Sequence, residues 1–213
     1  MAQIALGSKF YLNSEYFAEL EWERADVIFK NNYSVCDEGI YPVDIVQKTL
    51  GDCYLIATIC AISEKSERVR RLLTVQKKTK SGIYCVALCI MGTWEYIVMD
   101  DYFAIDPVSG YRPAFSCSKD NQLWVMLILK GWAKAYGGFL NVCGGTTLET
   151  LSELTGAPVA HFDTSINGTK FHWDNLHKAT KLGYILCSSS KTQENGVELN
   201  GTDPESGIVY CHA

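Results

Sequence analysis

The strongest structural constraint in the sequence is the run CYLIATICAISEKSERVRRLL, which follows a tight Gly51-Asp52 step. The run is too long for a typical β-strand, and its far end is too polar for one. Asp52 belongs to the residue types that cap helices, so we predict that Cys53 is the first residue of a buried helix. The apolar residues of that helix recur at helical spacing: Leu55, Ile56, Ile59, Cys60 and Ile62.

The remaining apolar pattern up to residue 156 predicts further helices and a hairpin. The runs IYCVALCI and WEYIVMDD are joined by a short turn at Met91-Gly92, which is typical of two antiparallel strands. An apolar helix is expected over 121–136, where a glycine pair follows and ends it, and another over 147–154. This mixture of elements indicates an α+β fold.

The pattern changes after Gly156. The runs YILCSS, around Tyr184, and IVYCHA, at the end of the sequence, have the composition of strands. We therefore expect an N-terminal segment over 1–21, a mostly helical first subdomain over 22–156 and a β-rich second subdomain over 157–213.

The composition argues against several classes of protein. The net charge is -5 at pH 7, whereas domains that bind nucleic acids usually carry a basic surface. No stretch approaches 18 apolar residues, so no membrane span is expected, and the N-terminus lacks the features of a secretory signal. The nine cysteines are odd in number, and several lie in apolar runs. Free thiols in a reducing cytoplasm are therefore expected.

Cys53 and Gln47 form the pattern that bears on catalysis. A cysteine attacks a carbonyl as its thiolate, and the partial positive charge at a helix N-terminus lowers the pKa of a thiol placed there. Gln47 lies six residues earlier, and a glutamine amide can donate to an oxyanion. Considered separately, each residue has a simpler explanation: Cys53 as a buried structural cysteine, and Gln47 as a solvent-exposed glutamine.

Four segments together resemble the calpain family of cysteine proteases. QKTLGDCYLIA resembles the family motif Q-x-x-x-G-D-C-[WY]-L-[LI]-A. WEYIVMDDYF, LWVMLILKGWAKAYGGF and GGTTLETLSELTG resemble later segments of the same protease core, in the same order. The Gly-Asp before the cysteine favours calpains over other papain-type proteases. The resemblance implies a papain-like α+β core in which Cys53 is the nucleophile and Gln47 completes the oxyanion hole.

The resemblance also implies a histidine base, for which four histidines compete. In calpains this histidine follows a strand and opens an H-A-Y motif, which favours His212 over His161, His172 and His177. Cys211 stands where a glycine usually precedes that motif. A terminal histidine without a catalytic role is the alternative.

The third catalytic residue of the family is an asparagine beyond the histidine, and it has no counterpart before the sequence ends at Ala213. Such a residue orients the imidazole ring. Two functions are therefore expected to compete: a cysteine endopeptidase that cleaves protein substrates, and a catalytically impaired calpain-like interaction module. The resemblance further implies that the second subdomain is incomplete and that a longer protein carries further calpain domains.

Calpain cores bind calcium, and the resemblance assigns the first calcium site to Asp37, Gly39, Asp44 and Gln122. Gln122 stands where the family has a glutamate, so one negative charge is lost and calcium binding is expected to be weak or absent. No organic cofactor is expected. Asp100 and Asp101 are not expected to form a metal pair, because adjacent residues of a strand point to opposite faces.

A zinc site formed by Cys85, Cys89, Cys211 and His212 is the remaining metal hypothesis. The spacing of CVALC is tolerable for zinc. On a strand, however, its two cysteines share one face and are explained as part of the core.

Overall fold

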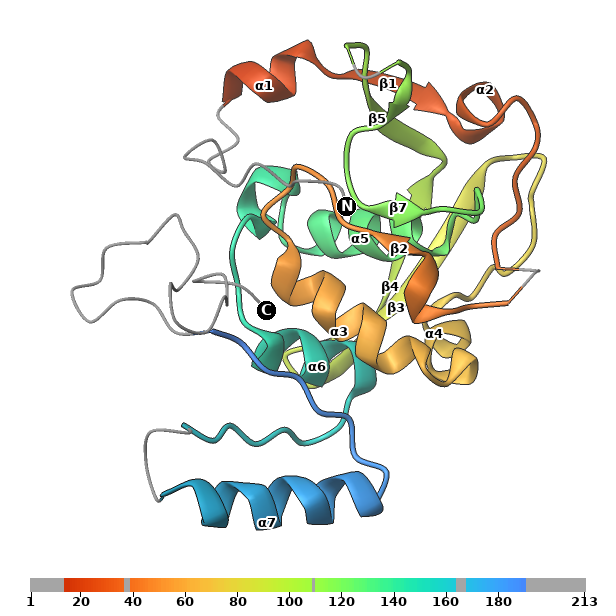
Figure 1. The fold of residues 1–213 in the computed structure, drawn as a ribbon. Coiled ribbons are helices and arrows are strands. Elements are labelled where there is room, and N and C mark those ends of the chain that lie inside the picture. Colours follow the sequence, from red (N-terminus) through yellow and green to blue (C-terminus); the bar gives the residue numbers. More distant parts are fainter. Residues whose placement is uncertain (1–13, 37–38, 109, 164–167, 191–213) are drawn as a thin grey trace.

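The computed structural model describes residues 14–36, 39–108, 110–163 and 168–190, and Figure 1 shows their arrangement. Helices combine with small antiparallel sheets, which confirms the α+β class. The α-helices are α1 (Ser14–Glu19), α2 (Ala25–Ile28), α3 (Cys53–Ser63), α4 (Ser66–Leu72), α5 (Trp124–Ala135), α6 (Thr147–Thr155) and α7 (Gly168–Lys181). The 3-10 helices are η1 (Pro42–Asp44) and η2 (Phe139–Val142). The strands are β1 (Glu21–Arg24), β2 (Ile45–Val46), β3 (Ile83–Ile90), β4 (Thr93–Asp100), β5 (Tyr102–Asp106), β6 (Arg112–Pro113) and β7 (Cys117–Ser118).

Most of the predicted elements are present where the sequence places them. β3 and β4 pair antiparallel along their full length, which confirms the hairpin. Met91 and Gly92 both have positive φ, as the tightest hairpin turns require. The helices expected over 121–136 and 147–154 correspond to α5 and α6. Local sequence pattern is therefore sufficient to locate these elements.

The long run after Asp52 forms two helices instead of one. α3 begins at Cys53 as predicted, but the chain leaves the helical conformation at Lys65, where φ is -120° and ψ is 101°. The break falls in the polar stretch SEKSE, which offers no apolar face to the core. α4 then resumes and buries Val69 and Leu72.

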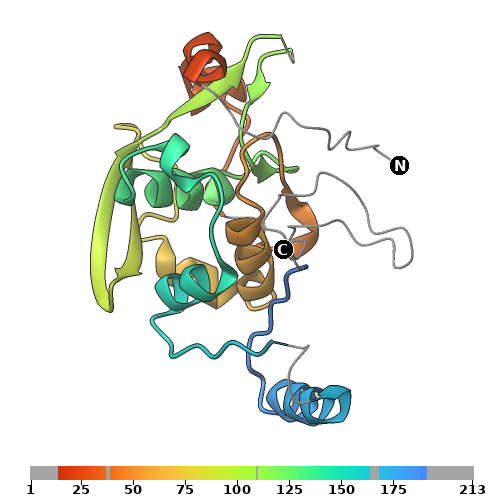
Figure 2. The same ribbon diagram turned by 90° about the vertical axis from the view of Figure 1, so that its left-hand side faces the viewer.

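The core is centred on α5, which the hairpin β3–β4 flanks on one side (Figure 2). Lys134 donates to the Val98 carbonyl at 2.6 Å, and Lys130 donates to the Asp100 carbonyl at 3.1 Å. Both lysines therefore tie α5 to the backbone of β4. The α5 side chains in this core include Trp124, Leu127, Ile128 and Trp132.

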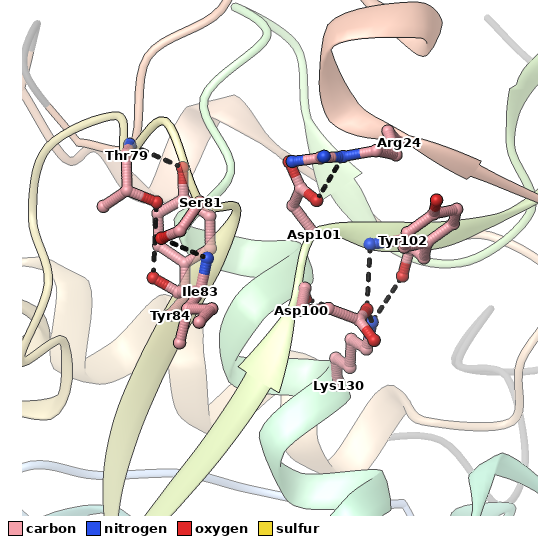
Figure 3. Close-up of polar contacts among 9 residues, drawn as sticks. All are labelled: Arg24, Thr79, Ser81, Ile83, Tyr84, Asp100, Asp101, Tyr102 and Lys130. Atoms are coloured by element: carbon pink, nitrogen blue, oxygen red, sulfur yellow. Dashed lines mark hydrogen bonds and ion pairs between the residues drawn. The ribbon is translucent and has the colours of Figure 1, made fainter.

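Two adjacent aspartates at the end of the hairpin make separate contacts (Figure 3). Arg24 donates to both carboxylate oxygens of Asp101, with Nε–Oδ1 at 2.9 Å and Nη2–Oδ2 at 3.1 Å. Asp101 is only 1% exposed. Asp100 instead accepts from the Tyr102 N–H at 3.0 Å and from the Lys130 ammonium group. Each aspartate therefore pairs with a different cation, Asp101 with Arg24 and Asp100 with Lys130.

α7 lies at the opposite end of the molecule from α1 in both views (Figures 1 and 2). It carries two of the histidines considered above, His172 and His177. No helix among the described residues has the length and apolar composition needed to cross a membrane.

The strand predicted around Tyr184 is not present. Residues 184–190 form no strand in the structure. A strand requires a hydrogen-bonded neighbour, and none of the described strands pairs with this segment. The run IVYCHA, which is predicted to form a strand of the same subdomain, lies outside the described residues.

Gly82 provides a test of the Arg24–Asp101 pair. A Cβ at Gly82 would lie 2.2 Å from Nη2 of Arg24 and 2.5 Å from Oδ1 of Asp101, whereas a Cβ at Gly92 would have nothing within 4 Å. Both glycines have positive φ, so both substitutions share the backbone strain. We expect Gly82→Ala to lower the free energy of unfolding by about 2 kcal/mol more than Gly92→Ala, because only the former displaces the buried Asp101 carboxylate from its partner. Urea denaturation followed by circular dichroism measures both, and equal losses would contradict this role.

Candidate active site

Cys53 is the first residue of α3 and is half-buried. The Asp52 carbonyl accepts from the N–H groups of Leu55 at 3.0 Å and Ile56 at 2.9 Å, so helical hydrogen bonding begins directly at this point. The three residues that follow Cys53 are buried. The cysteine therefore lies where a buried helix meets the surface, beside the positive end of the helix dipole.

Gln47 lies at the other end of the short stretch that leads to this helix. It follows β2 directly and is half-buried. β2 is fixed by antiparallel pairing with β7. Residues 47–52, called the linking loop below, thus connect a paired strand to the start of α3.

One side of the linking loop is attached to the segment that precedes β7. The Thr49 hydroxyl donates to the Ala114 carbonyl at 3.0 Å. The Lys48 ammonium group contacts the Pro113 carbonyl. Since β7 itself pairs with β2, these side-chain contacts extend that pairing along the loop.

The other side of the linking loop is attached to the stretch between η2 and α6. The Gly144 N–H donates to the Gly51 carbonyl at 2.8 Å. The Tyr54 hydroxyl donates to the Val142 carbonyl at 2.9 Å. A Cβ at Gly145 would lie 2.5 Å from the Tyr54 ring, so only glycine permits this close approach. The loop is therefore held on two sides, which restricts how far Cys53 and Gln47 can move apart.

Asp52 occupies the N-cap position of α3, but its side chain does not cap the helix. The side chain turns inward, is fully buried, and accepts from the Ser116 hydroxyl at 2.9 Å through Oδ2. Its other oxygen, Oδ1, has no hydrogen-bond partner among the described residues. Burial raises the pKa of the carboxyl to about 7, against the opposing effects of the Ser116 hydrogen bond and a backbone hydrogen bond. The predicted helix start is confirmed, and the predicted capping role of the side chain is wrong.

Ser116 is the residue at this site that the sequence did not indicate. Its surroundings, PAFSCSKD, contain no periodicity or motif that marks the position. It lies 64 residues from Asp52 in sequence, and only the fold brings the two together.

The residues assigned to calcium are only partly brought together. Asp37 lies outside the described residues. The Gln122 amide Nε2 donates to the Gly39 carbonyl at 2.8 Å and also to Asp120 Oδ2. The Asp44 carbonyl accepts from a backbone N–H, that of Lys119, at 2.9 Å.

This arrangement fits calcium poorly. Calcium requires six to eight oxygen ligands, whereas Gln122 turns its donor nitrogen toward the Gly39 carbonyl. Its oxygen, Oε1, is buried and has no partner in the part of the chain that the structure describes. Within the same part, no group of three or more histidine, cysteine or acidic side chains lies close enough together to hold a metal ion.

The predicted base, His212, and its neighbour Cys211 lie outside the described residues, so the zinc hypothesis and the base assignment stay predictions. His172 is buried on α7 and makes an edge contact with Phe171. His177 is exposed and makes an edge contact with Trp173. His161 is also exposed.

Asp52→Asn tests the buried charge. Because the pKa of Asp52 rises from 3.8 to about 7 on folding, the folded chain holds this proton more tightly than the unfolded chain. The carboxyl therefore reduces stability progressively as the pH rises from about 4 to 7, and fully above that range. We expect Asp52→Asn to raise the thermal midpoint by about 4 °C or more at pH 8.5 and by less at pH 5. Thermal unfolding followed by circular dichroism measures this, with Asp106→Asn as the control, and an equal gain at both pH values would contradict a buried charge.

Comparison with known proteins gives a consistent result. The family described as calpain family cysteine protease matches residues 3–213. The calpain-type cysteine protease DEK1 of Arabidopsis thaliana is 30% identical over 205 residues, which are 91% of this chain and 9% of that protein. Calpain clp-4 of Caenorhabditis elegans is 28% identical over 213 residues, which are 98% of this chain and 29% of that protein. Calpain-9 of Homo sapiens is 29% identical over 196 residues, which are 90% of this chain and 27% of that protein.

The chain thus spans less than a third of the length of each of these relatives. The match to the family nevertheless covers almost the whole of the chain, including the linking loop, the start of α3 and the stretch between η2 and α6. The chain therefore belongs to the calpain family of cysteine proteases.

Proposed function

We propose that this chain forms the catalytic core of a calpain-type cysteine endopeptidase, with Cys53 as the nucleophile. The observation that carries the proposal is the linking loop, which joins Gln47 to Cys53 and is hydrogen-bonded on both sides. Such a loop holds an amide donor and a thiol in a fixed relation, as acyl transfer requires. The position of Cys53 at the start of α3 adds the favourable field of the helix end.

In the proposed reaction the Cys53 thiolate attacks the scissile carbonyl carbon of the substrate. The oxyanion that forms accepts hydrogen bonds from the Cys53 backbone N–H and the Gln47 side-chain amide. His212 takes the thiol proton and gives it to the leaving amine, so that a thioester remains on Cys53. Water then hydrolyses the thioester and restores the thiol.

The substrate we propose is an extended segment of a protein, cleaved in the cytoplasm. An extended backbone presents its carbonyl groups without internal hydrogen bonds, which is what a nucleophile and two donors require. The length of the relatives supports further domains in the whole protein.

Covalent labelling tests the assignment of the nucleophile. An epoxysuccinyl or vinyl-sulfone peptide is expected to modify Cys53 at least tenfold faster than any other cysteine, because only an activated thiol reacts quickly. Peptide mapping by mass spectrometry identifies the modified residue. Cys53→Ala should abolish the labelling, whereas Cys60→Ala, a half-buried cysteine of the same helix, should leave it unchanged.

Preferential modification of another cysteine would contradict the nucleophile assignment. Rapid labelling of Cys53 without hydrolysis of a protein substrate would instead favour the calpain-like interaction module.

We also propose that calcium binds weakly at the predicted site, because the Gly39 carbonyl already accepts a hydrogen bond from the Gln122 amide. Gln122→Glu removes this donor and places a second carboxylate beside Asp120. We expect this variant to gain a calcium-dependent rise in thermal midpoint of about 3 °C or more at millimolar calcium, while the original chain changes by less than about 1 °C. Magnesium serves as the control ion. A calcium response of equal size in the original chain would contradict the proposal.

A further inference from the structure

The start of α3 has an unusual charge arrangement for a helix that begins with Asp. An aspartate at the N-cap position ordinarily accepts hydrogen bonds from the first N–H groups of the helix. Asp52 makes no such bond. Its carboxyl group is instead buried and held by the Ser116 hydroxyl at 2.9 Å.

This orientation matters because of what lies at the same helix end. A capping carboxylate would place a negative charge at the end of α3, where the proposed reaction also develops negative charge on sulfur and on the substrate oxygen. Like charges so close together oppose one another. A carboxyl group turned away leaves the positive end of the helix to the reacting atoms.

We infer that Ser116 is a positioning residue that holds the Asp52 side chain away from the end of α3, so that the helix end serves the Cys53 sulfur and the substrate oxyanion. The inference rests on the proposed function and deepens it. Ser116 comes from the segment before β7, whose carbonyls also fix the linking loop. The same segment thus anchors two side chains of the loop and removes a competing charge from the site.

The test measures the affinity of a peptidyl aldehyde, which adds reversibly to a catalytic cysteine and forms an oxyanion. Ser116→Ala frees the carboxylate and is expected to weaken aldehyde binding about tenfold at pH 8.5. Ser116→Thr keeps the hydroxyl and should bind within about threefold of the original chain. Ser63→Ala, which removes a buried hydroxyl at the far end of α3, is the matched control and should have no effect.

A second variant separates positioning from simple structural support. If Ser116 acts through the charge of Asp52, then Asp52→Asn/Ser116→Ala should bind the aldehyde within about threefold of Asp52→Asn alone. This comparison needs no stable Ser116→Ala protein, because the double variant buries no charge at this position. A double variant that binds more than tenfold more weakly than Asp52→Asn would overturn the inference, as would full affinity in a folded Ser116→Ala protein. Absence of aldehyde binding by the original chain would instead overturn the proposed function and this inference with it.

Discussion

The buried start of helix α3 is the constraint on which the described site depends. The first turn of α3 is embedded in the core, and Leu55 and Ile59 have no exposed surface. A helix buried so close to its first residue needs its connecting loop to be fixed, since an unpaired polar backbone group in the interior is costly. The linking loop meets that need through hydrogen bonds to two separate parts of the chain.

This packing has an electrostatic consequence. Asp52 is buried, its carboxylate forms no ion pair among the described residues, and one of its oxygens has no hydrogen-bond partner there. Burial of an ionised carboxyl group reduces the stability of the fold. The same burial raises the pKa of the Asp52 carboxyl to about 7, since the charged form is the one that burial disfavours. Locally unfavourable features of this kind are expected at functional sites, where a favourable arrangement of charge for a reaction matters more than the stability of the fold.

The sequence predicts those elements whose determinants are local. Thr146 caps the start of α6, because its hydroxyl oxygen accepts from the Glu149 N–H at 3.2 Å, and its hydroxyl also lies 3.0 Å from the Glu149 carboxylate. The hairpin turn at Met91-Gly92 is likewise specified by adjacent residues. The position of Cys53 at a helix start follows from the same kind of pattern.

The errors concern contacts between distant residues. The orientation of the Asp52 side chain is decided by Ser116, and local capping preference carries no information about it. The predicted strand around Tyr184 fails for a similar reason, because strand formation depends on a pairing partner as well as on composition. The assignment of Gln122 to a calcium site stays a prediction, and the direction of its amide toward Gly39 is a property of the folded chain that the sequence does not reveal.

The central claim is that the linking loop places the Gln47 amide and the Cys53 backbone N–H around one position, where a substrate oxygen gains negative charge. The most direct measurement is a crystal structure of the chain with a peptidyl aldehyde bound covalently to Cys53. The predicted result is a hemithioacetal oxygen within about 3.2 Å of both the Gln47 Nε2 and the Cys53 nitrogen. An adduct whose oxygen points to solvent, with the Gln47 side chain turned away from it, would contradict the claim.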